Sequence, residues 1–112
     1  MPGPQAKQTG AGAKNITTIM VYATQEGATL RLGADRPLVC KSMLLREPDR
    51  FVLDFEGQWN VDIPGIPQNK FIKAIRVGRQ PDSTRMVIDL HRAPASYRVI
   101  KASPQKLDVR LR

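Results

Sequence analysis

Two six-residue stretches of the chain alternate polar and apolar side chains with a period of two. They read Arg-Met-Val-Ile-Asp-Leu at 85–90 and Arg-Phe-Val-Leu-Asp-Phe at 50–55. In an extended chain, successive side chains point to opposite sides, so every second residue from Met86 or from Phe51 forms one large apolar side. This pattern predicts two half-buried β-strands.

The polar side of each stretch carries charges that cannot pair with each other. Arg85 and Asp89 lie four residues apart, which is roughly 13 Å along an extended strand. Each charge must therefore meet a partner on a neighbouring strand or stay in water. Two interpretations remain open: a solvated face with cross-strand charge pairs, worth about 0.2–1 kcal/mol each, and a face that docks an anionic or polar polymer.

Short apolar runs separated by Gly, Pro, Asp and Ser predict further strands on both sides of these two. The sequence contains no window with helical periodicity. The third strand has mixed residues on both faces, so its buried side stays undecided. The predicted strands of the first half are 16–22, 28–34, 38–46 and 50–56. In the second half, 72–77, 85–90 and 104–111 repeat the first, second and fourth of them, and 92–94 repeats the break at 35–37.

The second half of the chain, about 71–112, repeats the pattern of the first, about 15–57. A connection, 57–70, with two prolines and two glycines joins them. Two four-stranded units, each with one apolar face, can bury those faces against each other. The predicted fold class is therefore all-β: a small β-sandwich of two four-stranded, mostly antiparallel sheets related by an internal pseudo-two-fold duplication.

Length and composition are those of one small domain. The 112 residues suffice for a single core. Residues 1–14 lack large apolar side chains after Met1 and are predicted to form a disordered tail or linker, leaving 15–112 as the domain. No apolar run approaches the roughly 18 residues of a membrane span, and the N-terminus lacks the pattern of a signal peptide. The chain is thus either cytoplasmic or part of a longer exported protein.

The net charge of +8 indicates an anionic partner, but charge alone does not choose between nucleic acid, anionic lipid and an anionic cell-wall polymer. Guanidinium groups bind carboxylates through paired hydrogen bonds, so arginines expected to project from strands are the candidate ligand contacts. The single tryptophan, Trp59, is either a sugar platform or, more simply, an apolar plug at one end of the sandwich. The candidate arginines are Arg31, Arg50, Arg76, Arg79 and Arg85.

Catalysis and metal binding find no support in the sequence. Cys40 is the only cysteine, and we expect it to be a half-buried strand residue. His91, the only histidine, follows a strand end without a Ser or Cys motif beside it. The carboxylates do not have metal-binding spacing. We therefore expect neither a cofactor nor a metal.

Several of these stretches, in their order along the chain, are similar to a known family. They are 48–55, 72–77, the run Asp-Ser-Thr-Arg-Met-Val-Ile-Asp-Leu at 82–90, and Ala-Ser-Tyr-Arg-Val at 95–99. Together they resemble the AMIN domain, named for the N-terminal part of periplasmic N-acetylmuramoyl-L-alanine amidases and also found in type IV pilus secretins and other envelope proteins. The resemblance spans roughly 15–112.

The resemblance implies a non-catalytic, exported module with two small β-sheets, located in the periplasm. Such a module binds peptidoglycan or directs its host protein to a place in the envelope. Arg50 and Arg85, with the aspartates that follow them, fit the family's pattern. The first half departs from that pattern at Gly33 and Ala34, the counterparts of Asp89 and Leu90, which argues against two symmetric sites.

Two other functions stay open from the sequence alone. A basic β-module can bind nucleic acid, although single-strand binders usually place aromatic residues along a basic groove, and this chain has only six aromatic residues. Alternatively, an exposed sheet edge can pair with a strand of a partner and so serve the assembly of an envelope complex.

Overall fold

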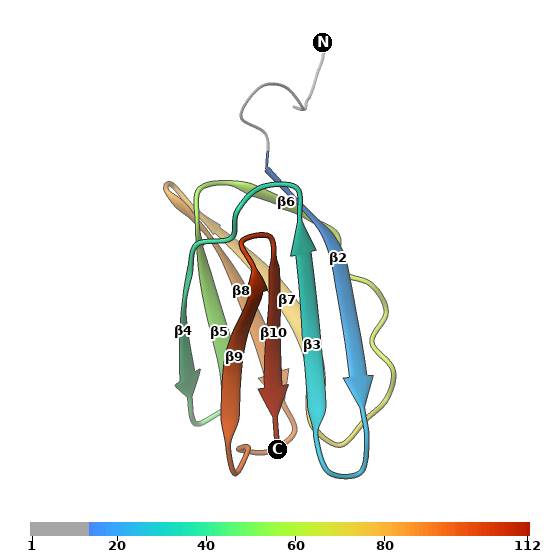
Figure 1. Ribbon diagram of the computed structural model, residues 1–112. Coiled ribbons are helices and arrows are strands. Elements are labelled where there is room, and N and C mark those ends of the chain that lie inside the picture. Colours follow the sequence, from blue (N-terminus) through green and yellow to red (C-terminus); the bar gives the residue numbers. More distant parts are fainter. Residues whose placement is uncertain (1–13) are drawn as a thin grey trace.

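The computed structural model describes residues 14–112, which form two β-sheets packed face to face (Figure 1). One sheet has the order β6 (Trp59–Val61), β2 (Lys14–Ala23), β3 (Ala28–Ala34), β10 (Lys106–Leu111), β9 (Tyr97–Ser103). The other has the order β4 (Cys40–Leu45), β5 (Arg50–Glu56), β8 (Ser83–Leu90), β7 (Ile72–Gln80). Every neighbouring pair is antiparallel except β2 and β6, which are parallel. The predicted all-β sandwich is confirmed.

The alternating pattern places the core where the sequence predicted it. In β8 the even-numbered residues from Thr84 to Leu90 are buried, and those between them are half-buried. Phe51, Leu53 and Phe55 of β5 are no more than 1% exposed. Each such side chain contributes about 1.5–3 kcal/mol by leaving water, so this shared interior accounts for the sandwich.

The predicted equality of the two sheets is wrong, because one of them has five strands. The fifth, β6, lies within the segment interpreted as a plain connection. It pairs Lys14, Asn15 and Ile16 of β2 with Trp59, Asn60 and Val61. Three residues are too few for an alternating pattern to stand out in a sequence, and the parallel partner lies far along the chain.

The two predicted halves also do not form one sheet each. The chain crosses from one sheet to the other at 35–39, 57–58, 62–71 and 91–96. As a result, β2 and β3 share a sheet with β10 and β9, while β4 and β5 share a sheet with β8 and β7. Each sheet therefore contains strands from both halves. The internal duplication stays a prediction.

Three smaller predictions can be placed. Residues 1–13 of the predicted tail lie outside the described residues, and Lys14 is the first residue of β2. In β4, Cys40 and Leu44 pack against the core, and burial raises the pKa of the Cys40 thiol. His91 is exposed directly after β8.

Candidate functional site

Three of the predicted arginines, Arg50, Arg76 and Arg85, lie on one flat surface, the outer side of the four-stranded sheet. We call this surface the four-strand face. The register of the strands arranges its side chains in three rows across the sheet. The rows are Lys41–Asp54–Arg85–Gly78, Met43–Val52–Val87–Arg76 and Leu45–Arg50–Asp89–Ala74.

Arg85 and Asp54 form a two-point ion pair across β8 and β5. The Arg85 Nε and Nη2 atoms donate hydrogen bonds of 2.7 and 2.9 Å to the two Asp54 carboxylate oxygens. This hydrogen bonding is the main reason that the pKa of Asp54 is lowered. The two residues lie directly opposite each other in the register, so these charges pair across neighbouring strands, which was one of the two arrangements open from the sequence.

Arg76 holds Asp89 in the same way from the other side of β8. Its Nε and Nη2 atoms donate hydrogen bonds of 2.7 and 2.9 Å to the Asp89 carboxylate, and this bonding lowers the pKa of Asp89. Arg50 lies opposite Asp89 in the register, but its Nη1 atom donates to the carbonyl oxygen of Pro48, 2.7 Å away. The predicted face with cross-strand charge pairs is thus present.

Sequence reasoning missed the apolar row between the two charged rows. Met43, Val52 and Val87 lie side by side there. Val52 is 2% exposed, whereas Met43 at the edge of the sheet is 40% exposed. The signal was present in the two stretches, since each has a Val between its Arg and its Asp. Its meaning depended on the register, which brings the two valines together.

The other predicted site residues lie elsewhere. Arg31 is on the outer side of the five-stranded sheet, where it donates hydrogen bonds of 3.0 and 3.1 Å to Asp108. Arg79, at the end of β7, donates to the carbonyl oxygen of Trp59 at 2.7 Å. The structure therefore divides the predicted arginines between two faces and one end of the sandwich.

Trp59 has the position of the plug rather than that of an exposed platform. Its side chain is 1% exposed, and its indole N–H donates to the carbonyl oxygen of Glu56 at 2.8 Å. The ring packs 6.2 Å from Phe55, and the Lys14 ammonium group lies 5.5 Å from its centroid. A sugar could reach this ring only if the end of the sandwich opened, so we leave Trp59 out of the site proposed below.

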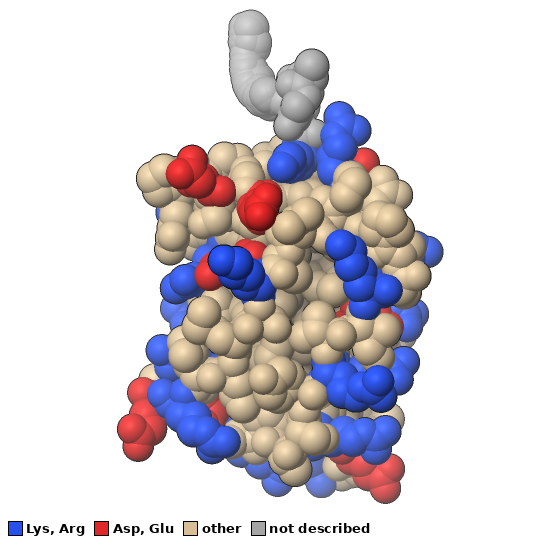
Figure 2. All heavy atoms as spheres, turned by 60° about the vertical axis from the view of Figure 1, so that its left-hand side comes forward, with Lys and Arg blue, Asp and Glu red and all other residues tan. Residues whose placement is uncertain are grey.

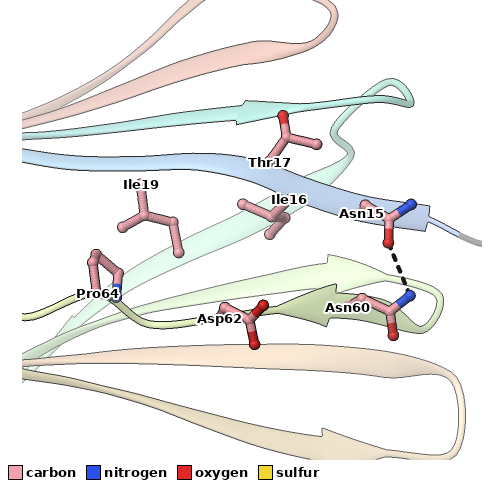
Figure 3. Close-up of a pocket in the computed structure, with 7 residues that line it drawn as sticks. All are labelled: Asn15, Ile16, Thr17, Ile19, Asn60, Asp62 and Pro64. Carbon is pink, nitrogen blue, oxygen red and sulfur yellow. Dashed lines mark hydrogen bonds between the residues drawn. The ribbon is translucent and has the colours of Figure 1, made fainter.

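A separate recess of about 520 Å³ lies between β2 and the segment that follows β6. Figure 3 shows Ile16 and Ile19 on one side of it and Asp62 and Pro64 on the other. At one end, the Asn60 side-chain amide donates to Asn15 Oδ1 at 2.9 Å. None of the predicted arginines lines this recess, so it is distinct from the four-strand face.

The described part of the chain, 14–112, holds no group of three or more His, Cys, Asp or Glu side chains that could bind a metal ion. The same residues include no helix long and apolar enough to cross a membrane.

The fold and the ion-paired sheet face define a small β-sandwich module. The family model of the AMIN domain matches residues 18–111, so the chain belongs to the AMIN domain family. AMIN domains are non-catalytic modules of envelope proteins such as amidases and secretins, and they occur in periplasmic proteins. A comparison with curated proteins found none that matches the chain.

Proposed function

We propose that this chain is a peptidoglycan-binding module that localises an exported host protein in the periplasm, and that the four-strand face makes the contact. Membership of the AMIN family supports the ligand class. One observation supports the four-strand face as the contact surface: Arg50, Arg76 and Arg85 lie together on it, around an apolar row.

The ion pairs prepare this face for the carboxylates of peptidoglycan stem peptides. Arg76 and Arg85 each use Nε and Nη2 for an aspartate, and no other residue in 14–112 accepts a hydrogen bond from the Nη1 atom of either. Their side chains are 61% and 37% exposed. Because the aspartates fix the guanidinium groups in position, less side-chain entropy is lost when a ligand binds.

The apolar row gives the glycan strand a place to lie. The flat faces of sugar rings carry C–H groups, which pack against apolar side chains without losing hydrogen bonds. Hydroxyl groups at the rim of a ring would then meet the charged rows on either side. Met43 lies at the edge of this apolar row, and the neighbouring charged row ends at Gly78, where no side chain blocks an extended polymer.

Nucleic acid fits the exposed surface less well than peptidoglycan. Among the aromatic side chains, the three phenylalanines and Trp59 are buried, and only Tyr22 and Tyr97 are exposed, by 46% and 43%. Tyr22 lies on the outer side of β2, whereas Tyr97 packs its ring 5.1 Å from Phe51 of the opposite sheet. These two rings cannot form a row on which successive bases stack.

Co-sedimentation of the purified chain with isolated sacculi tests this function. We expect retention at moderate salt for the natural chain and a loss of about tenfold or more in affinity for the double variant Arg76→Gln, Arg85→Gln, because charge-assisted hydrogen bonds to carboxylates are lost. The unfolding midpoint of each variant is measured alongside. This separates a lost contact from a lost fold.

The matched control is Arg36→Gln, Lys70→Gln, which removes the same two charges from exposed positions off the four-strand face. It should sediment with sacculi as the natural chain does. Equal losses for the two double variants would show that net charge, not this face, causes retention. Tight, steeply salt-dependent binding of single-stranded DNA without sacculus retention would support the nucleic-acid alternative.

A further inference from the structure

The outer side of the five-stranded sheet places two arginines directly opposite each other. Arg98 of β9 and Arg110 of β10 are register partners. Arg110 is in turn opposite Thr29 of β3, and Thr29 is opposite Tyr22 of β2. We call these four side chains the arginine row. Figure 2 shows, on the side of the molecule that it presents, Lys and Arg side chains on both sides of an uncharged strip.

We expect this placement of two arginines to reduce the stability of the free protein. Opposite residues of an antiparallel pair have Cβ atoms about 4.5–5.5 Å apart, and like charges at such positions are destabilising. Within residues 14–112, neither Arg98 nor Arg110 makes an ion pair. Asp108 lies two residues before Arg110, but both of its carboxylate oxygens already accept hydrogen bonds from Arg31.

A small recess lies at this end of the sheet, beside the β2–β3 turn. It has a volume of about 200 Å³, and its lining includes Tyr22, Thr29, Arg110 and Arg112. Glu26 also lines it, without an ion pair to either arginine among the described residues. Arg110 and Arg112 thus meet polar donors in a concave place, beside which Arg98 lies outside the lining.

We propose that the arginine row is a binding site for a doubly charged, phosphate-like group. Guanidinium groups match the oxygens of phosphate with two-point hydrogen bonds. Two guanidinium groups on neighbouring strands can each bind a different pair of oxygens of the same phosphate-like group. The bound anion would remove the repulsion between Arg98 and Arg110, and the Thr29 hydroxyl offers a further donor beside Arg110.

This site goes beyond peptidoglycan binding and does not depend on it. It lies on the other sheet, and its ligand is a phosphate-like group rather than a stem-peptide carboxylate. Sacculus retention should therefore be unchanged when the arginine row is altered, so a failure of either proposal can be told from a failure of the other.

The test is thermal unfolding of the full chain with inorganic phosphate, compared with sodium chloride at equal ionic strength. We expect phosphate to raise the unfolding midpoint of the natural chain more than chloride does. For Arg98→Gln, we expect a higher midpoint than that of the natural chain in low salt without phosphate, because the repulsion is gone. The same variant should bind phosphate about tenfold more weakly or worse in titration calorimetry.

Two further variants keep the test specific. Lys106→Gln removes a charge from the same strand and face but lies opposite Gly33, so it should keep the phosphate effect. Glu26→Gln removes the carboxylate of the recess and should tighten phosphate binding. The proposal is overturned if phosphate protects Arg98→Gln as much as the natural chain, or if phosphate has no effect beyond that of chloride.

A vesicle-binding experiment shows whether the phosphate belongs to a lipid headgroup or to a soluble molecule. Vesicles of phosphatidylcholine with and without phosphatidic acid are mixed with the chain. Binding that requires phosphatidic acid and is lost in Arg98→Gln assigns a lipid headgroup. Binding of inorganic phosphate without vesicle binding assigns the phosphate of a soluble molecule or polymer. Vesicle binding that Arg98→Gln keeps contradicts the site.

Discussion

The outer faces of the five-stranded and the four-stranded sheet distribute their charges differently. On the four-strand face, the central row is Met43–Val52–Val87–Arg76, and aspartates in the rows beside it hold Arg76 and Arg85. On the five-stranded sheet, the central row contains the ion pair itself, Arg31 with Asp108. The row beside it then has Arg110 opposite Arg98, without a carboxylate between them.

The difference shows what each face can do. The arginines of the four-strand face are held by aspartates without a ligand, and we propose that its apolar row suits a long polymer with scattered carboxylates. On the other sheet, Arg98 and Arg110 lie opposite each other without an ion pair within residues 14–112. One compact anion between them would therefore stabilise that face most. The predictions that follow exchange features between the two faces or remove them, beginning with the largest expected effect.

The largest effect should come from placing a charge in the central row of the four-strand face. Val52→Asp puts a carboxylate at a position that is 2% exposed. We expect a loss of at least about 2–3 kcal/mol in the free energy of unfolding, because a buried charge without a partner is costly. Urea unfolding measures it. A variant as stable as the natural chain would contradict the packing described for this row.

A second substitution sharpens the same comparison. Val87 lies opposite Val52, as Arg31 lies opposite Asp108 on the other sheet. Adding Val87→Arg to Val52→Asp should therefore recover part of the lost stability by copying that pair, whereas Val87→Arg alone should not stabilise the chain. If the double variant is less stable than Val52→Asp alone, a cross-strand Asp–Arg pair does not stabilise the central row of the four-strand face.

Acid should weaken both faces through their aspartates. Hydrogen bonds from Arg85, Arg76 and Arg31 lower the pKa of Asp54, Asp89 and Asp108, respectively. A carboxyl group whose pKa is lower in the folded state stabilises the fold above its unfolded pKa, near 3.9, and that contribution disappears as the pH falls through the folded pKa. Unfolding free energy measured from pH 6 to pH 2 should decline from about pH 4 downwards.

One of these pairs can be removed to check the cause of that decline. Asp54→Asn should cost about 1 kcal/mol or less at pH 7, because Arg85 is partly exposed and water screens the pair. Its stability should also fall less steeply with acid than that of the natural chain. An unchanged slope would mean that the Asp54–Arg85 pair does not contribute to the pH dependence.

The smallest effect should come from giving the arginine row a carboxylate of its own. Thr29→Asp places an acid directly opposite Arg110, as Asp54 lies opposite Arg85. We expect a gain of about 0.2–1 kcal/mol in low salt together with weaker phosphate binding, measured by unfolding and calorimetry. A destabilised variant that binds phosphate normally would contradict the account of this row.

Much of the fold could be predicted from the sequence because alternation is a local property. The buried sides of β5 and β8 follow directly from residues 50–55 and 85–90, and the order of motifs along the chain led to the correct family. The strand β6 could not be predicted, since three residues carry too little pattern. The mixing of the two halves within each sheet could not either, because strand pairing depends on long-range contacts.

The residue types of the candidate site were expected from the sequence, whereas their arrangement was not, and their role in binding stays a prediction. Arg50, Arg76 and Arg85 share a face because their strands are neighbours, and the row of Val52 and Val87 exists only in the observed register. The same applies to Arg98 and Arg110, which are separated by a turn in the sequence and were not singled out. Trp59 was a candidate because of its residue type. Its burial and the hydrogen bond from its indole N–H to a backbone carbonyl oxygen place it inside the sandwich instead.

The central claim, that the four-strand face binds peptidoglycan, is tested most directly by a nuclear magnetic resonance titration of the isotope-labelled chain with soluble muropeptides. We expect the amide signals of β5, β7 and β8 to shift in a saturable way, and those of β3, β9 and β10 to stay in place. Shifts confined to β3, β9 and β10, or no saturable shift at muropeptide concentrations in the millimolar range, would contradict the claim.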